Sequence, residues 1–229
     1  MRSVKDGVNS LSKACNNSRV EETAATILEH SPPLTGDGQR LALATYWLLA
    51  EGAPVEVERI AKRTGLDCSQ VEALLDSWPG VFRDDAGRVV GFWGLSTTKL
   101  GPHRLEIDGV RLWAWCAWDT LFLPALLGRP GDVESRSPLD GQPVGLRVAP
   151  GRIERASPAN LLMSMVPARE SDDFIRTFCH QIHFFASASE GERWTAGHDG
   201  AFLMPLGDAF ELAMRVNRAR YGSAVPSGR

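Results

Sequence analysis

The N-terminal part of the chain combines apolar residues at helical spacing with breaker segments. Residues 1–38 predict a polar, partly helical lead-in that closes at Gly36-Asp37-Gly38. Three segments then place apolar residues every three or four positions, as one face of a helix does: residues 39–50, 57–65 and 69–78. Ser69 and Glu72 have the spacing of a capping box, so we expect the third helix to begin at Ser69.

Two strand-like runs follow these helices. Residues 81–83 and 89–92 flank the turn-forming segment 84–87 and predict a β-hairpin. Three helices and a hairpin in this order are typical of a winged helix-turn-helix, a fold that often binds DNA. The charge argues against DNA, because residues 39–95 hold six basic and eight acidic side chains and the third helix has no Lys or Arg. We therefore expect a structural or interaction module here.

Strand patterns dominate the chain after Gly101-Pro102. Residues 103–108 and 110–116 alternate around an Asp108-Gly109 turn, and residues 143–148 and 152–156 form a second predicted hairpin. The remaining patterns predict helices over Thr120–Leu127, Ser171–Cys179 and Gly207–Tyr221. Residues Ile182–Ala186 are predicted to form a buried strand.

The predicted fold class is α+β. An N-terminal winged-helix-like helical region would be followed by a mixed or antiparallel β-sheet core with flanking helices. The expected units are the lead-in 1–38, a winged-helix-like domain 39–95 and an α+β domain 96–229.

Composition narrows the class of protein. A chain of 229 residues, 43% hydrophobic and 23% charged, suits one large or two small domains and is not disordered throughout. The net charge of -3 argues against a protein that binds nucleic acid through an overall excess of positive charge. Residues 1–20 lack the apolar run of a secretory signal, and no stretch approaches the roughly 20 apolar residues of a membrane span. We expect a cytoplasmic protein with reduced thiols and no nucleic-acid or membrane partner.

The segment Trp113–Thr120, reading WAWCAWDT, carries the densest chemical signal. It places Cys116 and Asp119 three residues apart at the end of a predicted strand, with tryptophans on both sides. If the chain turns into a helix here, that spacing puts the thiol and the carboxyl on one face. Tryptophan walls would exclude water, raise the pKa of Asp119 and leave it able to give up a proton. The alternative is a buried structural cysteine with Asp119 as a helix N-cap.

A second signal lies in residues 178–185, which read FCHQIHFF. Cys179, His180 and His183 would bind a metal if a fourth ligand came from elsewhere, or the histidines would lower the pKa of the thiol. A core strand with hydrogen-bonded histidines fits the same residues. The four cysteines include no CxxC pair, and no GxGxxG, GxxxxGK[ST] or GxSxG motif occurs. No organic cofactor is therefore expected.

Two long segments resemble the organomercurial (alkylmercury) lyase family. Residues 105–129, LEIDGVRLWAWCAWDTLFLPALLGR, resemble its central signature, and residues 178–187, FCHQIHFFAS, resemble its second cysteine motif. The separation of the two cysteines also fits, at 179 − 116 = 63 residues. The resemblance covers roughly residues 36–221, including the acidic winged-helix-like part and the closing helix.

This resemblance implies roles for three residues. In the family, two cysteines and one aspartate cleave the carbon–mercury bond, and they correspond to Cys116, Cys179 and Asp119, which would also hold Hg as substrate and product. Many members carry a further cysteine in the loop after the first motif. Residues 133–138 have none, which bears on stability more than on activity. Some members have a second cysteine beside the later one; His180 stands there, which excludes a thiol relay.

The chemistry of mercury agrees with these residues, because thiolates are the preferred ligands of a soft cation. One thiolate would displace X from R–Hg–X and a second would raise the coordination number. Asp119 would accept a proton from one thiol and return it to the leaving carbon. The products would be R–H and a dithiolate-bound Hg(II), collected by cellular thiols or a mercuric reductase during mercury detoxification. The domain 96–229 would then be the catalytic one.

Two other classes of function stay open at this point. One is a winged-helix module that binds DNA or senses a metal through Cys179, His180 and His183. The other is a thiol hydrolase or transferase that uses Cys116, a histidine and Asp119.

Overall fold

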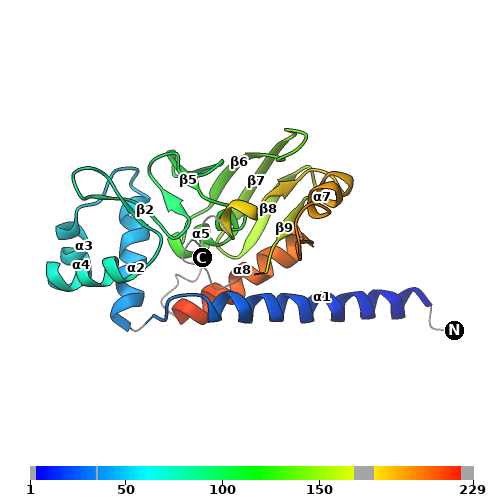
Figure 1. Ribbon diagram of the computed structural model, residues 1–229, viewed down its shortest axis with the longest axis horizontal. Helices are drawn as coiled ribbons and strands as arrows, with labels where there is room; N and C mark the ends of the chain where they lie inside the picture. Colours follow the sequence, from blue (N-terminus) through cyan, green and yellow to red (C-terminus); the bar gives the residue numbers. More distant parts are fainter. Residues whose placement is uncertain (1–3, 35, 168–177, 223–229) are drawn as a thin grey trace.

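The computed structural model describes residues 4–34, 36–167 and 178–222, with side chains from Asn17 onward (Figure 1). An eight-stranded sheet with the order β1-β2-β3-β5-β4-β6-β7-β8 forms its centre, and all neighbouring strands are antiparallel. The strands are β1 Val81–Arg83, β2 Val89–Phe92, β3 Leu95–Ser96, β4 His103–Ile107, β5 Val110–Ala114, β6 Gly131–Arg136, β7 Pro143–Ala149 and β8 Arg152–Ser157.

A second, three-stranded antiparallel sheet with the order β10-β9-β11 stands beside the first. Its strands are β9 Leu162–Met165, β10 Phe184–Phe185 and β11 Phe202–Pro205. The helices are α1 Val4–Glu29, α2 Gly36–Leu49, α3 Val57–Thr64, α4 Cys68–Ser77, α5 Asp119–Leu127, α7 Ala188–Thr195 and α8 Leu206–Tyr221, with a short 3-10 helix η1 at Cys179–Gln181. This α+β architecture confirms the predicted fold class.

Helix α5 is the centre of the core. Every residue from Asp119 to Leu127 is buried, as expected of a helix that is apolar on all sides. Side chains of two neighbouring helices also donate hydrogen bonds to backbone carbonyl oxygens of α5. Trp47 Nε1 of α2 donates to Leu126 O at 3.0 Å, and Asn217 Nδ2 of α8 donates to Phe122 O at 3.1 Å. Helix α5 is therefore fixed to α2 and α8 on both sides of the core.

The N-terminal unit has the predicted helix order, with two corrected boundaries. Gly36-Asp37-Gly38 opens α2 instead of preceding it. The N-cap of α4 is Asp67, not Ser69, and its backbone N–H donates to Gln70 Oε1 at 3.0 Å. Asp67 has the same capping chemistry as Ser69 and lies two residues earlier, which the sequence pattern did not resolve.

The predicted hairpins at β1–β2, β4–β5 and β7–β8 are confirmed, and Asp108 and Gly109 both have the positive φ that a two-residue turn requires (+50° and +80°). Segment 133–138, expected as a loop, is largely strand β6. Strands β3, β9 and β11 and helix α7 were not predicted. The buried strand Ile182–Ala186 is shortened to β10. The helix predicted over Ser171–Cys179 falls mostly outside the described residues.

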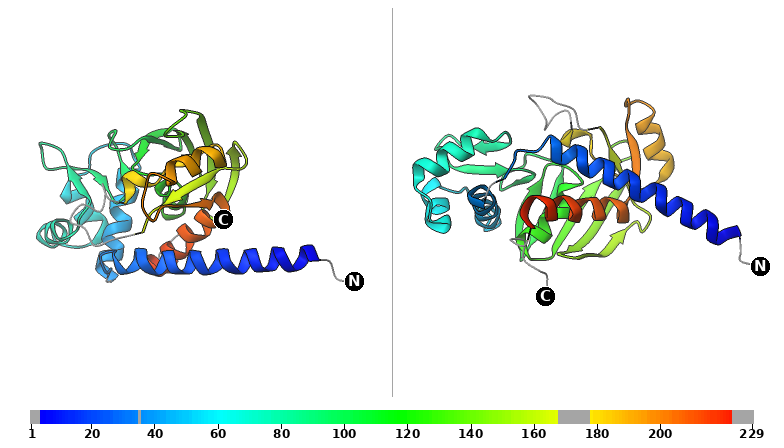
Figure 2. Two further views of the ribbon diagram at one scale, coloured as in Figure 1. Left: turned by 45° about the vertical axis from the view of Figure 1, so that its right-hand side comes forward. Right: turned by 90° about the horizontal axis from the view of Figure 1, so that it is seen from below.

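Helix α1 lies along α8 and extends past the body of the molecule (Figures 1 and 2). Val20, Ala24 and Ile27 of α1 are buried in this contact layer. Within the described part of the chain, no helix combines the length and apolar character that crossing a bilayer would need.

The main sheet runs without interruption through the predicted domain boundary. β3 contains Leu95 and Ser96, and it pairs with β2 on one side and β5 on the other. The division into units of 1–38, 39–95 and 96–229 therefore stays a prediction.

Candidate active site

Cys116 lies at the junction between β5 and α5. The strand ends at Ala114, where Trp115 N–H donates to Gly94 O at 3.1 Å. The chain then turns, and the Asp119 carboxylate at the first turn of α5 accepts the Cys116 backbone N–H through Oδ2 at 2.8 Å. A carboxylate is favoured at this end of a helix, where backbone N–H groups have no partner within the helix.

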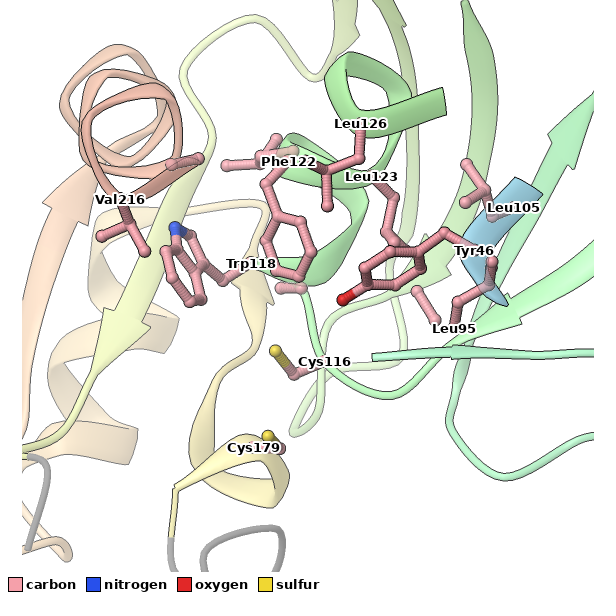
Figure 3. Packing of buried hydrophobic residues seen from close by; sticks show 14 of the residues in the cluster. Tyr46, Leu95, Leu105, Cys116, Trp118, Phe122, Leu123, Leu126, Cys179 and Val216 are labelled. Atoms are coloured by element: carbon pink, nitrogen blue, oxygen red, sulfur yellow. The ribbon is translucent and has the colours of Figure 1, made fainter. Parts of the chain in front are cut away.

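Cys179 reaches the same place from η1, far along the chain. Ala117 N–H donates to Ile182 O at 3.1 Å, which ties the segment after Cys116 to the segment after Cys179. Ser164 of β9 fixes η1 further: its hydroxyl donates to Gln181 O at 2.7 Å and accepts His183 N–H at 2.8 Å. Figure 3 shows the two cysteines on these neighbouring segments, below Trp118 and Tyr46.

The structure brings the three predicted site residues together. The Cys179 side chain and the Asp119 carboxyl both lie close enough to the Cys116 thiol to shift its pKa, and the Asp119 carboxyl is tied to Cys116 through the backbone N–H of that residue. All three residues are buried, with exposed fractions of 1% for Cys116, 4% for Asp119 and 9% for Cys179. Both cysteines are free thiols. Two sulfur atoms and one carboxyl group therefore lie together in the protein interior, largely shielded from water.

Burial sets the proton affinities of this group. It raises the pKa of Asp119 to about 6, while hydrogen bonds from the Cys116 thiol and from backbone N–H groups act in the opposite direction. The pKa of Cys116 is raised well above its ordinary value, first by burial and then by its hydrogen bond to Cys179 and the nearby Asp119 charge. Near pH 7, Cys116 therefore holds its proton while Asp119 is mostly ionised, so a thiol donor faces a carboxylate acceptor.

Two features of the site were missed at the sequence level. The turn Trp93-Gly94 between β2 and β3 packs on Asp119: a Cβ added to Gly94 would lie 2.5 Å from Asp119 Cγ. The Tyr46 hydroxyl of α2 donates to Trp93 O at 2.9 Å. A positive φ of +34° at Trp93 followed by glycine marks the turn in the structure, but a Trp-Gly pair is a weak turn signal in sequence.

The histidines of the second motif do not form a metal site. Burial, followed by the nearby His198, lowers the pKa of His183 to about 4. Its ring packs against Trp194 at 5.4 Å, and His180 is exposed. Among the described residues, no three His, Cys, Asp or Glu side chains are arranged to hold a metal ion. The sensor site predicted at Cys179, His180 and His183 is therefore not present among the described residues.

The other open interpretations also lack support in the geometry. The third helix of the winged-helix-like unit, α4, pairs its acidic Glu72 and Asp76 with Arg83 of β1, at 2.6 and 3.3 Å, so its acidic surface faces its own hairpin. A thiol hydrolase needs an imidazole beside its sulfur. Within the part of the chain that the structure describes, the side chains that affect the pKa of Cys116 or of Asp119 include no histidine.

Comparison with known proteins gives a consistent result. The family model described as "Alkylmercury lyase" matches residues 96–217, and that described as "Helix-turn-helix domain of alkylmercury lyase" matches residues 22–93. An alkylmercury lyase of Staphylococcus epidermidis is 41% identical over 180 residues, covering 79% of this chain and 82% of that protein. One from Streptomyces lividans is 39% identical over 181 residues, with coverage of 79% and 83%.

The fold also has a solved counterpart. The crystal structure of the mercury-bound form of MerB2 superposes with a TM-score of 0.70 and covers 88% of this chain and 98% of that one. The sequence identity is 23%, so this match concerns the fold.

Proposed function

The chain belongs to the alkylmercury lyase family, and we propose that Cys116, Cys179 and Asp119 carry out its reaction, the cleavage of a carbon–mercury bond. The observation that carries this assignment is the contact of two buried thiols with each other and of one of them with a buried carboxyl. This group has what protonolysis needs: two soft ligands for mercury and one proton carrier.

The reaction balances with these groups alone. One thiol bonds to the mercury of R–Hg–X, and its proton leaves with the displaced X. Cys116, whose thiol faces Asp119, then bonds to mercury and passes its proton to the ionised carboxylate. Protonated Asp119 delivers that proton to the carbon as the carbon–mercury bond breaks and its electron pair stays with carbon. The products are R–H and Hg(II) held by two thiolates.

The surroundings suit an apolar R group. Trp115, Trp118 and Phe122 are buried next to the site, with the rings of Trp118 and Phe122 in edge contact at 5.2 Å. Apolar walls bind an alkyl or aryl group and keep water away from the carbon that receives the proton. We therefore expect both aryl and alkyl mercurials as substrates.

Release of the metal needs other thiols. Hg(II) bound to two buried thiolates would leave by exchange with cellular thiols, or by transfer to a mercuric reductase. Such exchange fits a cytoplasmic protein, where small thiols are abundant and cysteines stay reduced. No organic cofactor enters this scheme.

The test is anaerobic incubation with phenylmercuric acetate and excess thiol, with benzene measured by gas chromatography. Wild-type protein should release one benzene for each phenylmercury consumed. Cys116→Ser and Cys179→Ser should each lower the rate at least 1000-fold, because serine is a poor ligand for a soft metal.

The matched control is Cys68→Ser, which removes an exposed free thiol at the start of α4. Its rate should stay within about twofold of wild type, as expected for a surface substitution away from the site. Full turnover by Cys116→Ser would overturn the assignment. Asp119→Ala should keep bound mercury and lose benzene release, whereas equal loss of both would mark Asp119 as a structural cap.

A further inference from the structure

The turn between β2 and β3 is held by many contacts. Trp93 has a φ of +34°, which is unusual for a residue with a side chain. Its ring lies 4.4 Å from that of Phe92, 4.8 Å from that of Trp78 and 4.6 Å from the Arg220 guanidinium of α8. Its indole N–H donates to Pro79 O at 2.7 Å. A strained backbone persists only where its surroundings enforce it, and strain of this kind collects at functional sites.

Gly94, the second residue of the turn, lies directly on the Asp119 carboxyl. A Cβ at Gly94 would lie 2.5 Å from Asp119 Cγ, 2.6 Å from Oδ1 and 3.0 Å from Oδ2. All three carboxyl atoms thus face the glycine, and no larger residue would fit. The Gly94 carbonyl also accepts Trp115 N–H, so the same turn fixes the strand end beside Cys116.

Tyr46 connects this turn to α2. Its hydroxyl donates to Trp93 O at 2.9 Å, and Tyr221 of α8 lies near enough to raise the pKa of Tyr46. The Tyr46 ring is fully buried and meets Phe92 edge-on at 5.0 Å. In Figure 3 the hydroxyl points toward the side of the core where Cys116 lies. Tyr46 and Tyr221 are the two tyrosines of the chain.

We propose that Tyr46 is a positioning residue for carbon–mercury protonolysis: it holds the Trp93-Gly94 turn against Asp119 and thereby keeps that carboxyl dry and aligned with the Cys116 thiol. This inference rests on the proton-carrier role assigned to Asp119 above. If Tyr46 acts in this way, the helix-turn-helix unit contributes to catalysis, because α2 and the β2–β3 turn both belong to the N-terminal part of the chain.

The physical argument concerns both orientation and hydration. Proton transfer needs the carboxyl within hydrogen-bond reach of the thiol and then of the carbon, and small displacements slow such steps strongly. The Gly94 backbone covers the Asp119 carboxyl, so a loosened turn would let that carboxyl move away from the thiol and would admit water beside it. Loss of the turn should therefore slow proton transfer without removing the two sulfur ligands of mercury.

The test compares Tyr46→Phe with Thr45→Val in the full-length protein. Both substitutions remove one buried hydroxyl from α2, but that of Thr45 bonds only to Leu41 O within the helix, at 2.8 Å. Single-turnover benzene release is followed at pH 7.5, and the Hg(II) retained per protein is measured separately. Tyr46→Phe should slow release about tenfold while retaining one Hg(II) per protein. Thr45→Val should change the rate less than about twofold and should also retain one Hg(II).

A second pair of variants tests the same claim without removing a core hydroxyl. Gly94→Ala and Gly87→Ala both place a Cβ at positive φ in a hairpin turn, but an added Cβ at Gly87 has nothing within 4 Å. Gly94→Ala should lower benzene release about 100-fold, and Gly87→Ala should stay near wild type. Equal rates in the two glycine variants, or a wild-type rate of benzene release in Tyr46→Phe, would overturn the inference. A loss of bound Hg(II) in Tyr46→Phe that matched its loss of rate would also overturn it. An inactive wild-type protein would instead refute the proposed function.

Discussion

Asp119, the proposed proton carrier, lowers the stability of the folded protein at neutral pH. Its carboxyl is buried under the Trp93-Gly94 turn, and burial raises its pKa from the ordinary 3.8 to about 6. In the unfolded chain the same group would ionise two pH units lower. Above pH 6 the folded protein therefore keeps a buried charge that unfolding would release into water, which lowers the free energy of unfolding.

Asp119→Asn should therefore stabilise the protein at neutral pH while abolishing activity. A pKa raised by about two units corresponds to about 3 kcal/mol of unfolding free energy at pH 7.5, which the neutral amide would recover. The gain should shrink to about 1 kcal/mol at pH 4.5, because the wild-type carboxyl is then protonated in the folded state. Urea unfolding at the two pH values measures this. A variant less stable than wild type at pH 7.5 would contradict the argument.

The rate of the chemical step should depend on the same ionisation. Asp119 must be ionised to accept the Cys116 proton, so single-turnover hydrocarbon release should fall as the pH drops through about 6. The Cys116 thiol stays protonated across this range because its own pKa is raised. Rapid-quench measurements with phenylmercury between pH 4.5 and 8 would show the midpoint. A rate that rises on acidification would mean that the carboxyl acts only as an acid.

At the scale of residues, the sequence predicted a buried thiol and carboxyl side by side but not the residues that support them. The Cys-x-x-Asp spacing and the tryptophans around it were enough to expect a buried thiol–carboxyl pair, and Asp119 does bond to the Cys116 backbone N–H. The alternative interpretation, Asp119 as the N-cap of the helix, is wrong by one residue, because the N-cap of α5 is Trp118 and Asp119 is the first residue of the helix. Gly94 and Tyr46 carry no local signal, since their importance comes from contacts with residues 25 and 47 positions away in the chain.

At the scale of elements, the placement of η1 decides whether the two thiols meet. This single turn of 3-10 helix has little stability of its own. It is held by the Ser164 hydroxyl and by the bond between Ala117 N and Ile182 O, with Ser137 Oγ accepting Ala186 N–H at 2.9 Å a little further on. Ser137 lies in the segment where many relatives were expected to carry an extra cysteine, and here a hydroxyl supports the second motif.

Ser164→Ala should loosen this arrangement. The His183 N–H and Gln181 carbonyl would lose a buried partner, which costs about 2 kcal/mol of unfolding free energy. Mercury should then be held less tightly, and a competing dithiol should remove Hg(II) more readily than from wild type. Ser96→Ala is the control: it removes a buried hydroxyl bonded to Trp113 O and should affect stability without affecting mercury retention. Equal mercury loss in both variants would refute a specific role for Ser164.

The elements missed at the sequence level share a physical reason. β3 and β10 have two residues each, too few to show an alternating pattern. In β6, the polar residues of GDVESR conceal a strand whose alternate positions are buried. Long amphipathic or fully apolar segments such as α2, α5 and α8 were recognised, because their periodicity extends over several turns. The long helices and the hairpin strands were therefore predictable, whereas β6 and the short strands that complete the site were not.

At the scale of the whole molecule, the site joins segments that are 63 residues apart, 179 − 116. Mercury bound to both sulfurs would crosslink the chain as a disulfide does. Closing a loop of this length reduces the entropy of the unfolded chain by an amount worth about 4 kcal/mol. The main sheet and η1 would then unfold less independently of each other.

One equivalent of Hg(II) should therefore raise the melting temperature by roughly 10 °C, given about 2–4 °C per kcal/mol for a chain of this size. Calorimetry with and without mercury, at low free thiol, measures the shift. Cys179→Ser should lose it, because one thiolate cannot crosslink the chain, whereas Cys68→Ser should keep it. An equal shift in Cys179→Ser would show that the metal stabilises the fold by another route.

The tryptophans that wall the site have an optical consequence. Trp115 and Trp118 lie one and two residues from Cys116, and both indoles are buried. A nucleus as heavy as mercury strongly promotes intersystem crossing in a neighbouring excited ring and so quenches its emission. The protein thus has a built-in fluorescent reporter: emission should dim when metal is captured and recover when it is handed on, so loading and unloading can be timed without an added dye.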